Sequence, residues 1–383
     1  MRVGIFGGSF DPVHNEHIAL VKHAIESLQL DKLIVMPAYA PPHKTGKRLT
    51  SDKVRLELCR LAFENIDKVE VSDYEIGQRG TSYTYLTCRH FKALYKSATL
   101  FFLVGTDMLR NFPTWKNPRD ILQNVTLAVC ARAEKQGWAE SENAKFFEKF
   151  GQNFVTIDYN GKAVSSTEIR VLAGAGMDLT PFVPQKVAEY IHKNKLYFIE
   201  NADKALLLED SKRREHSLRV AKVSAKRAVE LGIDERKAII SALFHDCAKS
   251  VPLSSPILDG FCLPTEYGEV PNSVVHQFAG AYLAEHIFGI TDSEVLNAIR
   301  YHTSGRANMT ELEKLVFLAD MVEENRNYDC VHILRALFYE KKDLDECLTR
   351  ALMETVSYLQ KKGVSVYPLT LQAYAFYKNA KKE

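Results

Sequence analysis

The sequence predicts an α/β domain with a doubly wound parallel sheet over residues 1–199, followed by an all-α domain over residues 200–383. First, short apolar runs alternate with helical patterns before residue 199, as in parallel sheets covered by helices on both faces. Second, strand signals fade after residue 199 while helical periodicity continues. Third, the chain has 383 residues, which is more than the roughly 100–200 residues of a single domain, so two domains are expected.

Five runs of β-branched and aromatic residues in the first half have the length of strands and few polar positions, which suits strands buried on both faces. They lie at 3–6, 33–36, 99–104, 125–129 and 154–157. Helical patterns between them cover about 15–29, 51–64, 84–96 and 166–173. Because ligands of such sheets bind where the strands end, we expect functional residues in the loops at the carboxyl edge.

The second half is predicted to be helical throughout. Its patterns cover roughly 204–231, 234–249, 273–288, 292–302, 310–324, 328–339, 343–362 and 368–381. Breakers such as Gly232, Pro252 and Gly289 fall between these segments, as helix ends require. The longest stretch without helical periodicity, 250–272, is expected to be a lid or a plain connection.

The composition, with 46% hydrophobic and 26% charged residues, is that of a soluble globular protein. A formal net charge of +2 provides no global field for nucleic acid or an anionic membrane. The seven cysteines are scattered without a C-x-x-C pair, so neither a disulfide framework nor a thiolate zinc site is expected. Signal-peptide and membrane-span patterns are lacking. We therefore expect a cytoplasmic protein without nucleic-acid or membrane partners, and the oligomeric state, a homo-oligomer included, stays open.

A loop with glycines and histidines follows the first predicted strand. The run G-G-S-F-D-P-V-H-N-E-H extends over 7–17 and contains His14 and His17. Glycines after a strand let the backbone approach a phosphate chain, and the following helix N-terminus offers N–H donors. Histidines three residues apart share one face of a helical turn, where they suit an α-phosphate under nucleophilic attack. An ordinary turn with two surface histidines is the alternative.

A second phosphate-binding pattern is S-S-T-E-I-R at 165–170. Ser165 and Glu168 have the spacing of a capping box, which predicts a helix beginning here with exposed amide groups. Arg170 in the first turns opposes the helix dipole, and that cost makes sense if Arg170 and the amides hold a polyphosphate. The alternative is a capped surface helix with Arg170 in solvent.

Together these motifs resemble the nucleotidyltransferase superfamily with the HxGH signature, in which Glu16 here replaces the glycine. The first half is most similar to bacterial nicotinate mononucleotide adenylyltransferases, also through P-P-H-K at 41–44, S-Y-T at 82–84 and V-G-T-D at 104–107. The resemblance implies a Rossmann-like nucleotidyltransferase domain. It implies transfer of AMP from ATP, with Mg²⁺, to nicotinate mononucleotide and release of pyrophosphate.

The resemblance also implies roles for individual residues. The ATP site is expected to contain Gly7, Gly8, Ser9, Phe10, His17, Gly105, Asp107, Ser166, Thr167 and Arg170. The mononucleotide site is expected to contain Lys44, Thr84, Trp115 and Arg132, with Trp115 stacked on the pyridine ring or, alternatively, packed in the core. The acceptor phosphate would attack the α-phosphorus directly, so catalysis would come from positioning and charge stabilisation. The residues expected to supply it are His14, His17, Lys44 and Arg170.

Histidines and aspartates interrupt the apolar helix faces of the second half. Asp246, for example, continues the stripe formed by Ile239, Ala242 and Leu243. Such groups are costly to bury unpaired, and a shared metal relieves that cost. A hydrogen-bonded core histidine is the alternative for any single position, but the recurrence favours metal. The expected ligands are His216, His245, Asp246, His276, His302 and Asp320.

The order H…HD…H…H…D resembles the HD-domain phosphohydrolases. R-E-H-S at 214–217, L-F-H-D-C-A-K at 243–249, A-I-R-Y-H-T-S-G at 298–305 and F-L-A-D at 317–320 resemble the bacterial symmetrical diadenosine tetraphosphate hydrolases. The resemblance implies an iron site of two metals that cleaves diadenosine tetraphosphate into two ADP, with Asp246 catalytic. One metal would be bound by His216, His245, Asp246 and Asp320, and the second by His276, His302 and the shared Asp246. The ligand types themselves also admit manganese or zinc.

Other activities remain open at this point. The first half could adenylylate another phosphorylated acceptor, such as phosphopantetheine. The second half could hydrolyse guanosine polyphosphates or cyclic nucleotides, or act as a non-catalytic nucleotide sensor. Lys249 and Arg306 are expected either to contact phosphate or to be solvated.

Overall fold

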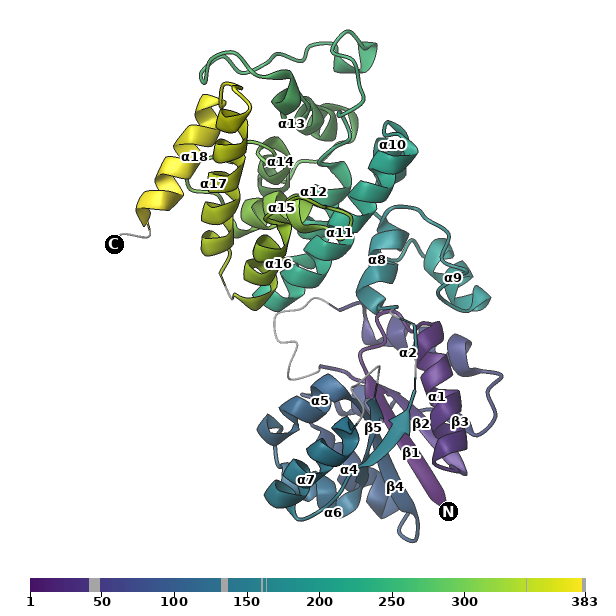
Figure 1. The fold of residues 1–383 in the computed structure, drawn as a ribbon. Helices are drawn as coiled ribbons and strands as arrows, with labels where there is room; N and C mark the ends of the chain where they lie inside the picture. The colour runs from purple at the N-terminus through teal and green to yellow at the C-terminus, as the bar shows by residue number, and fades with distance from the viewer. Residues whose placement is uncertain (41–48, 132–136, 160, 163, 342, 381–383) are drawn as a thin grey trace. The chain divides into compact units, whose positions relative to one another are not determined.

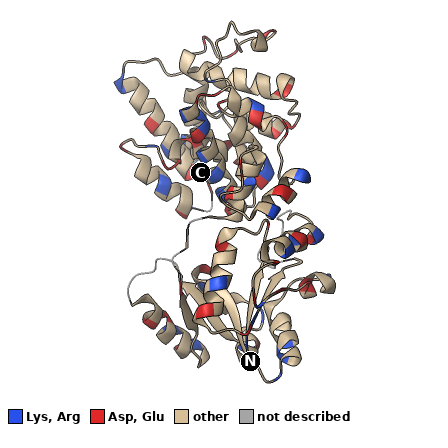
Figure 2. Cartoon of the chain, turned by 90° about the vertical axis from the view of Figure 1, so that its right-hand side faces the viewer, with Lys and Arg blue, Asp and Glu red and all other residues tan. Residues whose placement is uncertain are grey.

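The computed structural model describes residues 1–40, 49–131, 137–159, 161–162, 164–341 and 343–380. The chain divides into two compact units (Figure 1). The first comprises 1–169 and 179–194, and the second comprises 170–178 and 195–383. The functional boundary between residues 199 and 200 stays a prediction. Basic and acidic residues are interspersed along the helices of both units (Figure 2).

The first unit is built on a six-stranded sheet in the order β3-β2-β1-β4-β5-β6, and every pairing is parallel. Its strands are β1 (Arg2–Gly8), β2 (Lys32–Pro37), β3 (Val69–Val71), β4 (Thr99–Gly105), β5 (Thr126–Ala131) and β6 (Val155–Asp158). This confirms the doubly wound α/β fold. Five strands overlap the predicted runs, whereas β3 was not predicted. The strand order reverses between β1 and β4, which is where ligands bind in folds of this class.

Helices cover the sheet, and one of its faces packs mainly on α4, α6 and α7. Ile5, Ile34 and Phe102 of the strands share a buried cluster with Ile121 of α6 and Phe146 of α7. The helices of the first unit are α1 (Asn15–Ser27), α2 (Asp52–Phe63), α3 (Tyr74–Gln78), α4 (Thr84–Leu94), α5 (Thr106–Asn111), η2 (Phe112–Thr114), α6 (Pro118–Asn124), α7 (Trp138–Phe150), α9 (Gln185–Lys193) and the first turn of α8 (Ser166–Gly174).

The second unit contains helices and no strand among its described residues, which confirms the all-α prediction. Its helices, after the remainder of α8, are α10 (Ala202–Leu207), α11 (Ser211–Leu231), α12 (Glu235–Phe244), η3 (Pro256–Leu258), α13 (Asn272–Tyr282), η4 (Leu283–Ile287), α14 (Ser293–Arg300), α15 (Glu311–Val322), α16 (Val331–Glu340), α17 (Asp345–Lys361) and α18 (Pro368–Ala380). Helices α11, α12, α14 and α15 share one core through residues such as Val220, Ala242, Ala298 and Val316.

One predicted helix of this unit is divided in two, and the helix before the HD cluster ends early. The predicted helix over 204–231 is divided into α10 and α11, because the Asp210 side chain accepts a hydrogen bond from the Arg213 N–H at 2.9 Å and caps a new helix. The predicted helix over 234–249 ends at Phe244, so His245 and Asp246 lie just beyond its last turn. Among the described residues, no helix is long and apolar enough to span a membrane.

Candidate active sites

His14 and His17 form a stacked pair at the start of α1. The ring centroids are 3.6 Å apart, and the His14 backbone N–H donates to His17 Nδ1 at 3.2 Å. An accepting Nδ1 needs its lone pair, so a neutral His17 ring carries its proton on Nε2. Nε2 is thereby the nitrogen that can donate to a phosphate oxygen.

Aromatic contacts hold the His17 ring in place. The Phe10 ring meets the His17 ring edge-on with centroids 5.1 Å apart, and Phe6 meets Phe10 at 5.3 Å. Phe10 is buried and has a φ of 47°, a left-handed conformation that places its ring over Gly8. A Cβ at Gly8 would lie 3.0 Å from that ring. A side chain at position 8 would therefore displace Phe10 and loosen the support of His17.

Helix α8 begins beside the same loop. The Ser166 hydroxyl donates to the Pro12 carbonyl at 2.8 Å, and the Glu168 N–H donates to Ser165 Oγ at 3.2 Å. The N-termini of α1 and α8 therefore lie near each other, and their N–H dipoles suit an anion. Ser166 and Thr167 occupy the first turn of α8, as expected.

Arg170 does not extend into solvent. Its guanidinium is buried and forms an ion pair with Glu235, and both residues belong to the second unit. Its role as a polyphosphate ligand stays a prediction.

The other residues predicted for the nucleotide sites lie on β4 and the helices that follow. Gly105 precedes α5, and Asp107 in the first turn of α5 is exposed and pairs with Arg110 at 3.0 Å. Thr84 begins α4. Trp115 is buried against Phe112, with ring centroids 5.3 Å apart, so its stacking on a pyridine ring stays a prediction. Lys44 and Arg132 lie outside the described residues.

Arg55 is a residue that the sequence analysis missed. It lies on α2 with 1% of its surface exposed, and its guanidinium donates to the carbonyls of Ser9 at 2.8 Å, Ala38 at 2.7 Å and Thr50 at 2.9 Å. It therefore ties the loop after β1 to the segment after β2. In sequence, Arg55 resembles any surface cation of an amphipathic helix.

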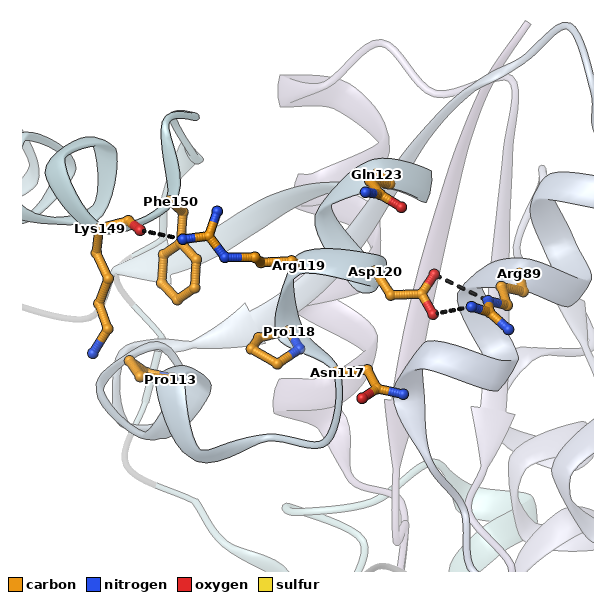
Figure 3. A pocket seen from close by; sticks show the side chains of 9 residues that line it. All are labelled: Arg89, Pro113, Asn117, Pro118, Arg119, Asp120, Gln123, Lys149 and Phe150. Carbon is orange, nitrogen blue, oxygen red and sulfur yellow. Dashed lines mark hydrogen bonds and ion pairs between the residues drawn. The ribbon is translucent and has the colours of Figure 1, made fainter.

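A separate pocket of about 620 Å³ lies among α4, α6 and α7 (Figure 3). Arg89 and Asp120 form an ion pair on one side of it, with Arg89 Nη2 2.6 Å from Asp120 Oδ2. On the other side, the Arg119 guanidinium donates to the Lys149 carbonyl at 3.3 Å. None of its lining residues belongs to the predicted nucleotide sites, and we assign it no role.

The second unit gathers the predicted metal ligands around Asp246. His276 Nε2 lies 3.2 Å and His302 Nε2 3.5 Å from Asp246 Oδ1, while His245 Nε2 lies 3.5 Å from Asp246 Oδ2. His216 Nε2 is 4.0 Å from Asp246 Oδ2 and 2.8 Å from Asp320 Oδ1. Two sets of side chains bring their ligand atoms within 4.8 Å of one another: His216, His245 and Asp246, and Asp246, His276 and His302.

Three of these histidines are oriented by hydrogen bonds at Nδ1. His245 and His302 contact the carbonyls of Ala242 and Ile299, each at 2.7 Å, and His216 contacts Glu323 Oε1 at 3.1 Å. A donated Nδ1–H leaves the Nε2 lone pair free to bind a metal, which is the usual arrangement of histidine ligands. Their Nε2 atoms all face Asp246.

The donors also have the burial and charge state that a metal requires. His245 Nε2 and Asp246 Oδ1 are buried and lack a hydrogen-bond partner within the described part of the chain. Burial lowers the pKa of both His245 and His276 to about 4, so both rings are neutral near pH 7. Burial alone would raise the pKa of Asp246, but the neighbouring histidines hold it well below its usual range. Neutral imidazoles beside ionised carboxylates fit a divalent metal ion.

Four charged residues around this cluster were not predicted as part of it. Glu323 contacts His216 and also accepts from Arg219 Nε at 2.9 Å. Arg213 Nη1 donates to Asp246 Oδ2 at 2.7 Å, and Arg326 pairs with Asp320.

Lys249 and Arg306 were expected either to contact phosphate or to be solvated, and both contact other side chains. Lys249 Nζ contacts both ring nitrogens of His276, at 3.1 and 3.0 Å. Arg306 makes two 2.7 Å bonds to buried Glu313.

The chain is similar to known proteins over both units. Residues 5–172 match a cytidylyltransferase-like family model, and residues 213–325 match an HD domain model. A probable nicotinate-nucleotide adenylyltransferase/Ap4A hydrolase of Mycoplasma genitalium is 30% identical over 332 residues, which cover 86% of this chain and 89% of that protein. A protein of the same name in Mycoplasma pneumoniae is 29% identical over 358 residues, which cover 89% of this chain and 95% of that protein. A probable nicotinate-nucleotide adenylyltransferase of Thermotoga sp. (strain RQ2) is 42% identical over 190 residues, which cover 50% of this chain and 94% of that protein.

Proposed function

The chain belongs to the family of two-domain proteins that join a cytidylyltransferase-like domain to an HD domain, and we propose that it is a bifunctional nucleotide enzyme. The first unit would transfer AMP from ATP to nicotinate mononucleotide, giving nicotinate adenine dinucleotide and pyrophosphate. The second would hydrolyse diadenosine tetraphosphate (Ap4A) symmetrically to two ADP. Both would act on free nucleotides in the cytoplasm.

The observation that best supports the first activity is the stacked pair of His14 and His17 beside the N-termini of α1 and α8. This cluster follows β1 at the point where the strand order reverses. In the proposed reaction, His17 Nε2–H and the helix N–H groups bind the phosphates of ATP, with which Mg²⁺ enters. The acceptor phosphate then attacks the α-phosphorus, and the positive donors stabilise the added charge.

Pyrophosphate release tests this proposal. We expect turnover with ATP and nicotinate mononucleotide and much less with phosphopantetheine, and nicotinamide mononucleotide is assayed beside them. His17→Ala should reduce kcat by roughly 100-fold or more, since it removes a donor to the developing charge. Lys193→Ala, an exposed cation at the end of α9, is the matched control. If turnover were greater with phosphopantetheine than with either pyridine mononucleotide, the proposed acceptor would be wrong and phosphopantetheine would be assigned instead.

The observation that best supports the second activity is the pair of ligand sets that share Asp246. The set of His216, His245 and Asp246, together with Asp320, would hold one metal ion. The set of Asp246, His276 and His302 would hold the second, and we expect both ions to be iron. Metal ions in such a centre supply a water nucleophile at neutral pH and stabilise charge on the leaving oxygen. Asp246 would hold both ions at a fixed separation, and the Nδ1 bonds of His216, His245 and His302 would keep the ligands oriented.

Product analysis after anaerobic purification tests this second proposal. Ap4A should give ADP alone, whereas asymmetric cleavage gives AMP and ATP. The protein should be supplied separately with iron, manganese and cobalt. No cleavage of Ap4A with any of these metals would remove the proposed activity. Hydrolysis of guanosine polyphosphates or cyclic nucleotides instead would assign a different substrate, and metal binding without any hydrolysis would favour a sensor.

A further inference from the structure

Glu16 is a buried carboxylate in the first turn of α1, between His14 and His17 in the chain. Only 7% of its surface is exposed, and the adenylyl transfer proposed above gives it no role. The Tyr159 hydroxyl donates to Glu16 Oε2 at 2.8 Å. Because a buried carboxylate is costly without a donor, this hydrogen bond stabilises Glu16 in its position.

Tyr159 directly follows β6, and its side chain lies against α1. Its backbone N–H donates to the Ala131 carbonyl at 3.4 Å, which continues the pairing of β6 with β5. Its ring centroid is 5.7 Å from that of His23. Because His23 comes seven residues after Glu16, both lie on the same face of α1. Tyr159 therefore joins the end of β6 to that face of the helix.

The chain after Tyr159 passes close to this hydrogen bond at Gly161. A Cβ at position 161 would collide with both the Glu16 carboxylate and the Tyr159 ring. Only a glycine allows the backbone to approach two side chains so closely. The segment after β6 is therefore fitted to the pair of Glu16 and Tyr159.

The connection from β6 to α8 is bonded to residues 12–16 at both of its ends. Tyr159 bonds to Glu16 at the first end, and Ser166 at the start of α8 donates to the Pro12 carbonyl at 2.8 Å at the second end. A short connection that is held at both ends has little conformational freedom. The position of the first turn of α8 beside the start of α1 therefore depends on both contacts.

We propose that Glu16 is a positioning residue for ATP, which acts through Tyr159 to hold the first turn of α8 where its N–H groups bind the phosphates. The inference rests on the proposed adenylyl transfer and adds a residue to its ATP site. The acceptor is expected at other elements, with Thr84 on α4 and Trp115 after η2. The contact between Glu16 and Tyr159 should therefore affect ATP and not the acceptor.

Kinetic constants of two variants test the proposal. Glu16→Ala and Tyr159→Phe should each raise the KM for ATP by about tenfold, the usual effect of losing a hydrogen bond to a charged group. The KM for nicotinate mononucleotide and kcat should stay within about twofold, because the α8 N–H groups bind the phosphates both before and during the reaction. The double variant should resemble either single variant, since both substitutions remove the same contact.

Two further variants make the result specific. Glu16→Gln keeps an oxygen that can accept from Tyr159 and should restore most of the affinity for ATP. Glu26→Ala removes an exposed glutamate near the other end of α1 and should change neither KM. If Glu16→Ala fails to fold, Tyr159→Phe carries the test, because it removes a single oxygen atom.

A contact that serves only stability would lower the melting temperature and the active fraction, and so reduce the apparent kcat at an unchanged KM for ATP. That result, or additive losses in the double variant, would overturn the inference. Equilibrium binding of ATP with Mg²⁺ to the full chain separates the inference from the proposed function, since the second unit is the same in every variant. If both single variants bind ATP more weakly while nicotinate mononucleotide is not adenylylated, only the proposed acceptor is wrong. A parent protein that binds no ATP would contradict both.

Discussion

Glu323 sets the orientation of His216 although it is not itself a predicted ligand. Its carboxylate contacts His216 Nδ1 at 3.1 Å and is itself held by Arg219 and the Asn325 N–H. Glu323→Gln should weaken Mn²⁺ binding by roughly 10- to 100-fold, because a carboxylate partner raises the basicity of a histidine ligand. Titration of the chelator-treated protein measures this. Glu324→Gln, at the exposed neighbouring position, should bind Mn²⁺ normally, and equal affinities of the two variants would contradict the role.

His245 and His276 should make the metal-free second unit sensitive to acid. Their pKa values are lowered by burial from 6.5 to about 4. Below about pH 6.5 the two histidines are protonated in the unfolded chain, whereas in the folded state they stay neutral down to about pH 4. The free energy of unfolding therefore decreases as the pH falls through this window. Each histidine contributes a slope of up to about 1.4 kcal/mol per pH unit.

Denaturant unfolding of the metal-free protein from pH 7 to pH 4 checks this slope. His276→Gln should flatten it, and His286→Gln, at an exposed position, should leave it unchanged. A stability that is constant over the window in the parent protein would contradict the neutral, buried state of these two rings.

The sequence predicted six side chains of the HD cluster but not the charged residues that surround them. Asp320 and the others were visible because polar groups on an apolar stripe are unusual. Glu323 directly follows the end of α15, three residues after Asp320 and at the spacing of the same apolar stripe, so the sequence pattern could have indicated it. Arg213 and Arg326 held none, because an arginine in a polar helix or loop usually faces solvent, and only the fold brings these two to the carboxylates.

At the scale of elements, α2 supports the loop after β1, which we predict to bind phosphate, through Arg55. Arg55→Met should leave the carbonyls of Ser9 and Ala38 without their donor and destabilise the first unit by about 3 kcal/mol. Adenylyl transfer should fall as well, because Ser9 belongs to the loop that leads to His14. Thermal unfolding and pyrophosphate release measure the two effects. Arg60→Met on the exposed face of α2 is the control. If the two variants had the same stability and the same adenylyl transfer, the supporting role of Arg55 would be contradicted.

The elements that could be predicted were those with a repeated pattern. Strand β4 shows a continuous apolar run, and its buried residues cannot be mistaken for a loop. Strand β3 has three residues, Val69, Glu70 and Val71, which are too few to establish a period. It exists because β2 offers it a free edge, a contact between distant segments that local sequence does not encode. The break between α10 and α11 depends on one cap, Asp210, inside a long helical pattern.

For the whole molecule, we expect two activities that can be removed one at a time. Asp246→Ala should abolish Ap4A hydrolysis and leave adenylyl transfer within about twofold, and His17→Ala should do the reverse, since the two proposed sites share no catalytic residue and independent sites have additive effects. Both assays on both variants measure this. A change of adenylyl transfer in Asp246→Ala would instead indicate that the second unit regulates the first.

Helix α8 contributes its first turn to one unit and its remainder to the other. Val171 and Ala175 lie in the core that also contains Ala202 and Val220, so their partners come later in the chain. On the ribosome, where folding proceeds from the N-terminus, an apolar helix face is synthesised before the residues that cover it. The nascent chain therefore passes through a stage at which its first half is complete and this face is still uncovered, and slow translation beyond residue 178 would prolong its exposure to chaperones and to other nascent chains.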